Sequence, residues 1–85
     1  MEHPAGHTRM IEYLKKEILR DPDAEIEPET PLVSSGMVDS FSLIQVVQEL
    51  EKITSLRIPA SKVAPRDLDT VARMFATAER VGTRR

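Results

Sequence analysis

The chain has 85 residues, no cysteine and a formal net charge of −2. This length predicts one small domain with a modest core and no large active-site cleft. Without cysteine there is no disulfide and no thiolate metal site, so any thiol chemistry must arrive on a cofactor. The mild acidity argues against a nucleic-acid binder, which usually presents a basic stripe.

The first residues are polar and carry no targeting signal. The segment Met1–Pro4 does not resemble a signal peptide, and the apolar runs of the chain are far too short to span a bilayer. We therefore expect a cytoplasmic protein without a membrane span. Residues 1–7 lack apolar periodicity, so we expect a disordered lead-in, and we assign no metal site to His3 and His7.

A first helix is expected from Thr8 to Arg20, with Thr8 as its N-cap. Its apolar stripe consists of Met10, Ile11, Leu14 and Ile18. Asp21-Pro22 should end the helix, because the residue before a proline avoids the α region. The next segment, residues 22–39, is long for a connection in so small a domain. We expect it to be ordered and to pack four apolar side chains into the core: Ile26, Leu32, Val33 and Met37.

A second helix is expected from Ser40 to Thr54. The centre of its inward face should be Ile44, Val47 and Leu50, widened by Leu43 and Val46. Asp39 or Ser40 can cap this helix, because a short oxygen-bearing side chain satisfies a free amide of the first turn. A phosphate ester on Ser40 would also meet the positive end of the helix dipole.

The rest of the chain predicts a turn over Ser55–Pro59, a short helical turn over Ala60–Ala64 and a last helix over Thr70–Arg80. Asp67 or Asp69 is the expected cap of the last helix, and residues 81–85 should fray. Three long helices and a short one predict an all-α protein, a small four-helix bundle. The expected core is Ile11, Leu14, Ile18, Leu32, Ile44, Val47, Leu50, Val71 and Phe75.

One motif carries a resemblance to a known family. Gly36-Met37-Val38-Asp39-Ser40-Phe41 resembles the Gly-x-x-Asp-Ser-[Leu/Phe/Met] attachment motif of acyl and peptidyl carrier proteins. Further segments match the family on both sides of the motif: Pro31-Leu32, Leu50-Glu51, Arg57-Ile58-Pro59 and Asp69-Thr70-Val71. The resemblance covers roughly Met10 to Arg80, so we expect a carrier domain over residues 8–80 with the acyl-carrier fold.

The resemblance implies a covalent cofactor on Ser40. In that family the serine carries a 4′-phosphopantetheine arm, derived from coenzyme A, whose thiol holds an acyl or aminoacyl group as a thioester. The implied partners are a phosphopantetheinyl transferase and the enzymes that activate and transfer the acyl or aminoacyl group. Asp39 either caps the helix or helps to position cofactor and metal in the transferase complex. The carrier itself is not an enzyme, and we expect a monomer.

Two other functions are alternatives to the carrier role. A hydrolase with Ser40 as nucleophile would need a base and an orienting acid, but both histidines lie in the N-terminal lead-in and Gly-x-Ser-x-Gly is absent. The alternative from a different class is a helical protein-interaction module without a covalent cofactor. Such a module would bind its partner through Phe41, Met37 and Ile58.

The surface beside Ser40 predicts how partners dock. Phe41 should be partly exposed, and Met37 and Ile58 are further candidates for contact with a partner or cargo. The outward positions of the second helix include Gln45 and Gln48, where the fatty-acid type of the family is strongly acidic. Fewer negative charges weaken electrostatic steering, so we expect a specialised stand-alone carrier and not the fatty-acid one.

Overall fold

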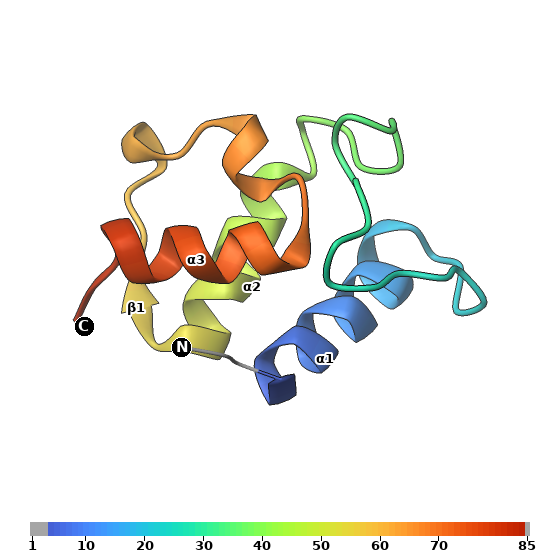
Figure 1. Cartoon of the computed structure of the whole chain (residues 1–85), viewed down its shortest axis with the longest axis horizontal. Coiled ribbons are helices and arrows are strands. Elements are labelled where there is room, and N and C mark those ends of the chain that lie inside the picture. The colour runs from blue at the N-terminus through green and yellow to red at the C-terminus, as the bar shows by residue number, and fades with distance from the viewer. Residues whose placement is uncertain (1–3, 85) are drawn as a thin grey trace.

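Residues 4–84 are described by the computed structural model. Its helices and strands, in chain order, are α1 (Pro4–Tyr13), η1 (Leu14–Ile18), α2 (Leu43–Thr54), β1 (Leu56–Arg57), η2 (Ala60–Lys62), η3 (Pro65–Leu68), α3 (Val71–Val81) and β2 (Thr83–Arg84). The three α-helices pack pairwise around one core, with α3 crossing α2 (Figure 1). The predicted all-α class is confirmed. The expected short fourth helix is present only as the two 3-10 turns η2 and η3.

The first helix begins at Pro4 and not at Thr8 as expected. A proline suits the first helical turn, where its missing N–H has no intrahelical partner to lose. Gly6 allows α1 to approach α3 closely, because a Cβ there would lie 2.8 Å from the Phe75 ring. The His7 ring packs on Phe75 with ring centroids 4.9 Å apart. Residues 6 and 7 are thus part of the packed structure, whereas His3 lies outside the described residues.

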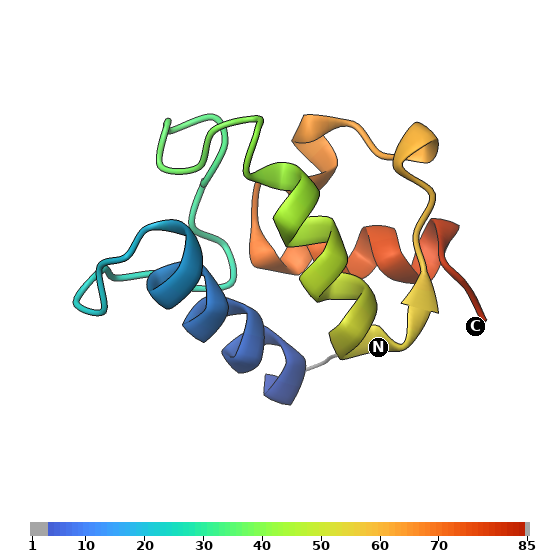
Figure 2. The same ribbon diagram turned by 180° about the vertical axis from the view of Figure 1, so that it is seen from behind.

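The helix continues past Tyr13 as the π-helical segment η1 and ends before Asp21-Pro22, as expected. Arg20 lies in the left-handed region with φ 54°, which turns the chain away from the helix axis. The long segment that follows is ordered along its course around one end of the molecule (Figure 2). Ile26 and Leu32 are buried, and Val33 and Met37 are half-buried, so the packing role predicted for this segment is confirmed.

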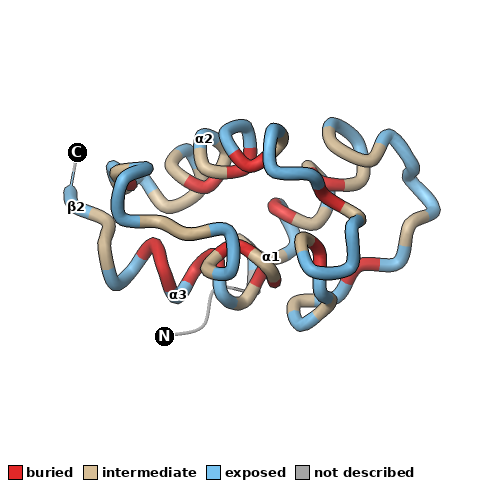
Figure 3. Tube along the Cα trace, turned by 90° about the horizontal axis from the view of Figure 1, so that it is seen from above, coloured by how far each residue is buried: buried red, intermediate tan, exposed pale blue. Residues whose placement is uncertain are grey.

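The facing of α2 differs from the expectation. Leu43, Val46 and Leu50 point into the core, whereas Ile44 is 67% exposed and Val47 is only half-buried. Both sets of residues have helical spacing, so the sequence offered two adjacent apolar rows and periodicity alone could not choose between them. Ile44 as a core residue is therefore wrong. Figure 3 shows the buried stretches of α2 and α3 turned toward each other.

Most of the remaining core was predicted correctly. Leu14, Leu32, Leu50, Val71 and Phe75 are buried, and Ile11 and Ile18 pack partly buried against them. Further buried residues fill the spaces between the helices, and Met10, Leu43 and Val46 among them belong to the apolar faces expected for the first two helices. These further residues are Met10, Val38, Leu43, Val46, Ile58, Leu68, Met74 and Ala78. Val38 matters most for the site, because it anchors the chain two positions before Ser40.

The cap of α3 is Thr70 and neither of the expected aspartates. The Thr70 Oγ1 accepts a hydrogen bond from the Arg73 amide at 3.0 Å. Asp67 instead accepts from the Ala64 amide at the start of η3, at 2.8 Å. Asp69 turns toward the loop that precedes Ser40. An extended residue directly before the helix is the geometry that a cap needs, and only Thr70 has it.

The C-terminal residues do not fray within the described range. Thr83 and Arg84 form an antiparallel pair with Leu56 and Arg57, in the register Leu56 to Arg84 and Arg57 to Thr83. Two-residue strands have no periodicity to read in a sequence, so this pairing could not be foreseen. It holds the end of α3 beside the turn that follows α2.

Candidate functional site

Ser40 lies on an exposed turn directly before α2. The helix begins at Leu43 and not at Ser40 as expected, because Ser40–Ser42 form a tight turn in which the Leu43 amide donates to the Ser40 carbonyl at 3.4 Å. The Ser40 hydroxyl has no hydrogen-bond partner among residues 4–84, and the cap position of α2 belongs to Ser42. An exposed, unengaged hydroxyl can be reached by an enzyme and esterified without disturbing the fold.

Asp39 orders this turn. Its Oδ1 accepts a hydrogen bond from the Ser42 amide at 2.8 Å. Because α2 begins at Leu43 with Ser42 at its N-cap position, this bond closes the turn before the helix, and Asp39 as the helix cap is wrong. Hydrogen bonds from the Ser42 amide first, and then from the Ser42 hydroxyl and the Phe41 amide, lower the pKa of Asp39. The carboxylate beside Ser40 is therefore ionised at neutral pH. Any role of Asp39 toward a cofactor stays a prediction.

The loop of residues 31–39, which leads to Ser40, is closed on itself. The Val38 amide donates to the Leu32 carbonyl at 2.9 Å, and the Gly36 amide donates to the Val33 carbonyl at 3.1 Å. Gly36 has φ 84°, a conformation that side chains disfavour, although a Cβ there would meet nothing within 4 Å. Glycine is thus needed at this position for its backbone and not for space.

A carboxylate from the other end of the chain holds this loop. The Asp69 Oδ1 accepts from the amides of Leu32, Val33 and Ser34 at 3.2, 2.8 and 2.8 Å. Its Oδ2 accepts from the Ser34 hydroxyl at 2.9 Å. We call this set of bonds the Asp69 clamp. Sequence reasoning missed it, because the partners lie 35 to 37 positions from Asp69 and no local pattern links them.

Two large apolar side chains stand exposed beside Ser40. Phe41 is 85% exposed, as predicted, and Ile44 on the first turn of α2 is 67% exposed. Gln45 and Gln48 are exposed on the same helix, and Met37 is half-buried. Exposed aromatic and aliphatic residues of this size mark surfaces that bind partners. Whether these residues contact a partner stays a prediction.

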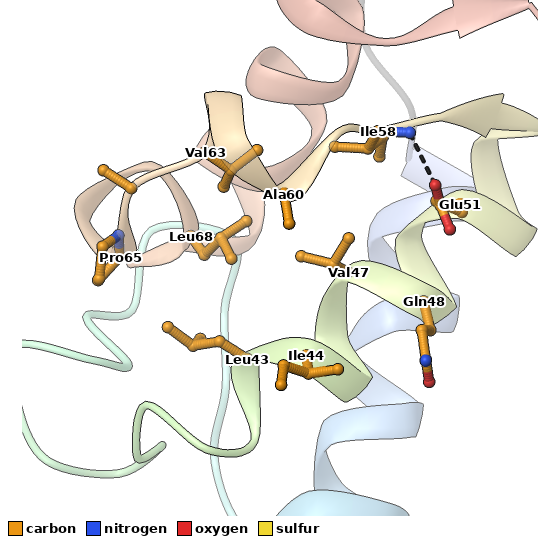
Figure 4. Close-up of a pocket in the computed structure, with 11 residues that line it drawn as sticks. Leu43, Ile44, Val47, Gln48, Glu51, Ile58, Ala60, Val63, Pro65 and Leu68 are labelled. Carbon is orange, nitrogen blue, oxygen red and sulfur yellow. Dashed lines mark hydrogen bonds between the residues drawn. The ribbon is translucent and has the colours of Figure 1, made fainter.

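An apolar groove of about 340 Å³ opens next to this surface. In Figure 4, Leu43 and Val47 on α2 face Leu68 and Val63 on the η2–η3 segment across the groove. Ile58 is buried at 4% exposure in the groove wall, so it could touch cargo in the groove but not a partner on the surface. Gln48 and Glu51 are the polar residues of the lining. Because the other lining residues are apolar, the groove favours an apolar group.

The acidic residues of α2 are engaged within the protein. Glu49 forms an ion pair with Arg9 of α1, with a 3.8 Å separation, and its side chain is only 13% exposed. The Glu51 carboxylate accepts the Ile58 amide at 2.7 Å (Figure 4). Glu49 is therefore turned toward α1 and away from the exposed face of α2. The exposed face of α2 retains Gln45, Gln48 and Lys52, and its negative charge is even lower than the sequence indicated.

The pairing that a serine hydrolase requires is not formed in the described part of the chain. His7 packs against the Phe75 ring, and it makes no hydrogen bond with Ser40. No group of three or more histidine, aspartate or glutamate side chains within residues 4–84 is arranged to hold a metal ion. The site offers the exposed Ser40 hydroxyl, an ordered turn and an apolar surface.

Comparison with family models identifies the kind of site. The model described as phosphopantetheine attachment site matches residues 11–77, which include the Ser40 turn, the groove and the Asp69 clamp. Domains of this family are the sites of covalent 4′-phosphopantetheine attachment. Comparisons with curated proteins and with solved structures gave no match. None of the helices within residues 4–84 is both long and apolar enough to cross a membrane.

Proposed function

The chain belongs to the phosphopantetheine attachment-site family, and on this premise we propose that it is a discrete carrier protein with its arm on Ser40. The arm supplies a terminal thiol that holds an acyl or aminoacyl group as a thioester. One observation carries the assignment to Ser40. Its hydroxyl is exposed and free of hydrogen bonds to residues 4–84, on the turn that Asp39 orders. Ser34 and Ser35, by contrast, use their hydroxyls in hydrogen bonds.

The residues around Ser40 have simple roles in this proposal. During modification by a transferase, the Ser40 oxygen forms a phosphodiester and loses its proton, while the phosphoanhydride bond to the nucleotide part of coenzyme A breaks. The bond between Asp39 and the Ser42 amide fixes the backbone of the turn that carries the hydroxyl. The carrier then contributes position and not catalysis. A tethered group has a high effective concentration at whichever enzyme docks.

Partner enzymes dock, in this proposal, on the apolar surface of Phe41 and Ile44, with Met37, Gln45 and Gln48 at its edges. The support is the exposure of these side chains beside Ser40. The groove behind Ile44 can receive an apolar part of the cargo, with Ile58 in its wall. The low negative charge of α2 supports a specialised carrier. We further propose that the protein acts as a monomer in the cytoplasm, together with the transferase and coenzyme A.

The absence of cysteine gives a direct test. The chain has no thiol of its own, so a thiol-reactive dye should label none of the unmodified protein. After incubation with coenzyme A and a broad-specificity phosphopantetheinyl transferase, we expect one added arm by intact mass and one labelled thiol per chain. A reaction without transferase is the control. A folded protein that gains neither mass nor thiol would refute the carrier role.

The exposed Phe41 also fits a second function, a protein-interaction module without a covalent cofactor. The same reaction separates the two functions. An interaction module would stay unmodified and would still bind a partner through Phe41 and Met37. The carrier gains the arm first and then exchanges acyl groups with its partners.

A further inference from the structure

We propose that Asp69 is a positioning residue for the modification site: from the start of α3 it fixes the 31–39 loop so that Ser40 is presented in one orientation. This inference rests on the proposed function of Ser40. It adds a residue that lies 29 positions from Ser40 in the sequence and contacts neither the arm nor the transferase in any step described above.

The geometry of the Asp69 clamp is that of a carboxylate seated among converging amides. Three consecutive N–H groups, from Leu32 to Ser34, donate to one oxygen, and the Ser34 hydroxyl donates to the other. The Leu32 amide also donates to the Asp69 carbonyl at 2.7 Å. Hydrogen bonds to an ionised acceptor are shorter and stronger than those between neutral groups. The clamp thus holds the loop through four hydrogen bonds to one carboxylate.

The clamp is linked to Ser40 through a short series of contacts. Asp69 holds Leu32, and the Leu32 carbonyl accepts the Val38 amide at 2.9 Å. Val38 is buried at 2% exposure, and it is followed directly by Asp39, which orders the Ser40 turn. Both ends of the loop are therefore fixed relative to α3. If the Asp69 side chain is lost, the Val33 and Ser34 amides lose their acceptor, whereas the Leu32 amide keeps the Asp69 carbonyl. The loop is then held mainly by Leu32 and Val38.

The role is specific to Asp69 within its own segment. Thr70 caps α3, so Asp69 is not needed to start the helix. Asp67 is chemically identical, but its partners are the Ala64 amide directly before η3 and the Arg80 guanidinium of α3, and neither belongs to the 31–39 loop. Asp67→Asn is therefore a matched control. It removes a charge two positions away and leaves the clamp intact.

The experiment compares wild type with Asp69→Ala, Asp69→Asn, Ser34→Ala and Asp67→Asn in the unmodified form. One readout is amide hydrogen exchange of residues 32–38, which needs no modification. The other is kcat and KM for phosphopantetheinyl transfer. For Asp69→Ala we expect about tenfold faster exchange in the loop and about tenfold lower kcat, since bonds to a charged acceptor are lost and the hydroxyl is misplaced. The KM should change less than kcat, because the docking surface on α2 is unaltered.

Asp69→Asn keeps an acceptor of the same shape, so it should fall between wild type and Asp69→Ala in both readouts. Ser34→Ala loses one bond and should show a smaller effect in the same direction. Asp67→Asn should match wild type in loop exchange and in kcat. If Asp69→Ala does not fold, as shown by lost protection of α2 and α3, Asp69→Asn decides. If loop exchange and kcat of Asp69→Asn then differ from those of wild type by less than about twofold, the proposal is overturned.

The failure of this inference can be told from the failure of the proposed function. Wild type that accepts no arm contradicts the carrier role of Ser40. Wild type that accepts the arm no faster than a folded Asp69→Ala contradicts only the positioning role of Asp69. Equal loss of kcat in Asp67→Asn and Asp69→Asn would also overturn it, because the effect would then come from charge and not from the clamp.

Discussion

At the scale of single residues, two aspartates prepare the site from opposite sides. Asp39 lies next to Ser40 and holds the Ser42 amide, whereas Asp69 lies on the far side of the loop and holds three amides. Both carboxylates act as acceptors for backbone N–H groups that would otherwise be left without a partner at a loop or a helix start. Both pKa values are lowered by these bonds, the Ser42 amide being the largest cause for Asp39 and the Ser34 amide for Asp69.

The lowered pKa of Asp69 predicts how stability changes with pH. Its folded-state pKa lies below the unfolded-state value, so the carboxylate stabilises the fold above the unfolded-state pKa and this contribution is lost as pH falls through the folded-state pKa. From about pH 5 downward, the free energy of unfolding of wild type should fall more steeply than that of Asp69→Asn. Denaturant titrations at several pH values measure this difference. Parallel curves for the two proteins would show that the clamp carboxylate adds no pH-dependent stability.

At the scale of elements, α2 has two apolar rows with different roles. Leu43, Val46 and Leu50 fill the core, while Ile44 and Val47 line the groove and the exposed surface. We therefore expect the largest losses of stability when the inner row is altered. The outer row is available for cargo or partners.

This division predicts unequal effects of truncation. Val46→Ala should destabilise the fold by roughly 1–3 kcal/mol, because it deletes buried methyl groups and leaves a cavity. Ile44→Ala should cost less than about 0.5 kcal/mol, since its side chain is 67% exposed. Val47→Ala, half-buried, should fall between them. Denaturant midpoints with a common slope give the three values, and a cost at Ile44 equal to that at Val46 would mean that the helix faces the other way.

The elements also show which features a sequence can reveal. Helix spacing and the Asp39-Ser40 motif were sufficient for the all-α class, the location of the candidate site and part of the core, whereas the turn at Ser40–Ser42 was expected to be helical. The rotation of α2 about its own axis could not be predicted, because Ile44 and Val46 both satisfy a helical period. The Asp69 clamp, the Arg9–Glu49 pair and the β1–β2 pairing join residues far apart in the chain. Such contacts follow from the packed arrangement, and no local pattern encodes them.

At the scale of the whole molecule, charge is distributed so that the proposed docking surface is nearly neutral. Glu49 and Glu51 are bound to Arg9 and to the Ile58 amide, which leaves Gln45, Gln48 and Lys52 on the exposed face of α2. Recognition by partners should then rest on apolar contact at Phe41 and Ile44, with little long-range steering.

This surface predicts partner choice for the modified protein. It should be a poor substrate for a ketosynthase of fatty-acid synthesis, and Gln45→Glu combined with Gln48→Glu should improve it, because added negative charge restores steering. The improvement should shrink at high salt, which screens exposed charges. Phe41→Ala should impair transfer with the protein's own partner enzyme. Acyl-transfer kinetics at two salt concentrations decide this, and a wild type as active as a fatty-acid carrier would contradict the specialised role.

The central claim, an arm on Ser40, is tested most directly by locating the modification. Wild type and Ser40→Ala are incubated with coenzyme A and a phosphopantetheinyl transferase, digested, and the modified peptide is sequenced by mass spectrometry. The Ser40 side chain makes no hydrogen bond to residues 4–84, so Ser40→Ala should fold with a loss below about 0.5 kcal/mol. We predict one arm on Ser40 in wild type and none in the folded variant. An arm on Ser34, Ser35 or Ser42, or a modified Ser40→Ala, would contradict the account.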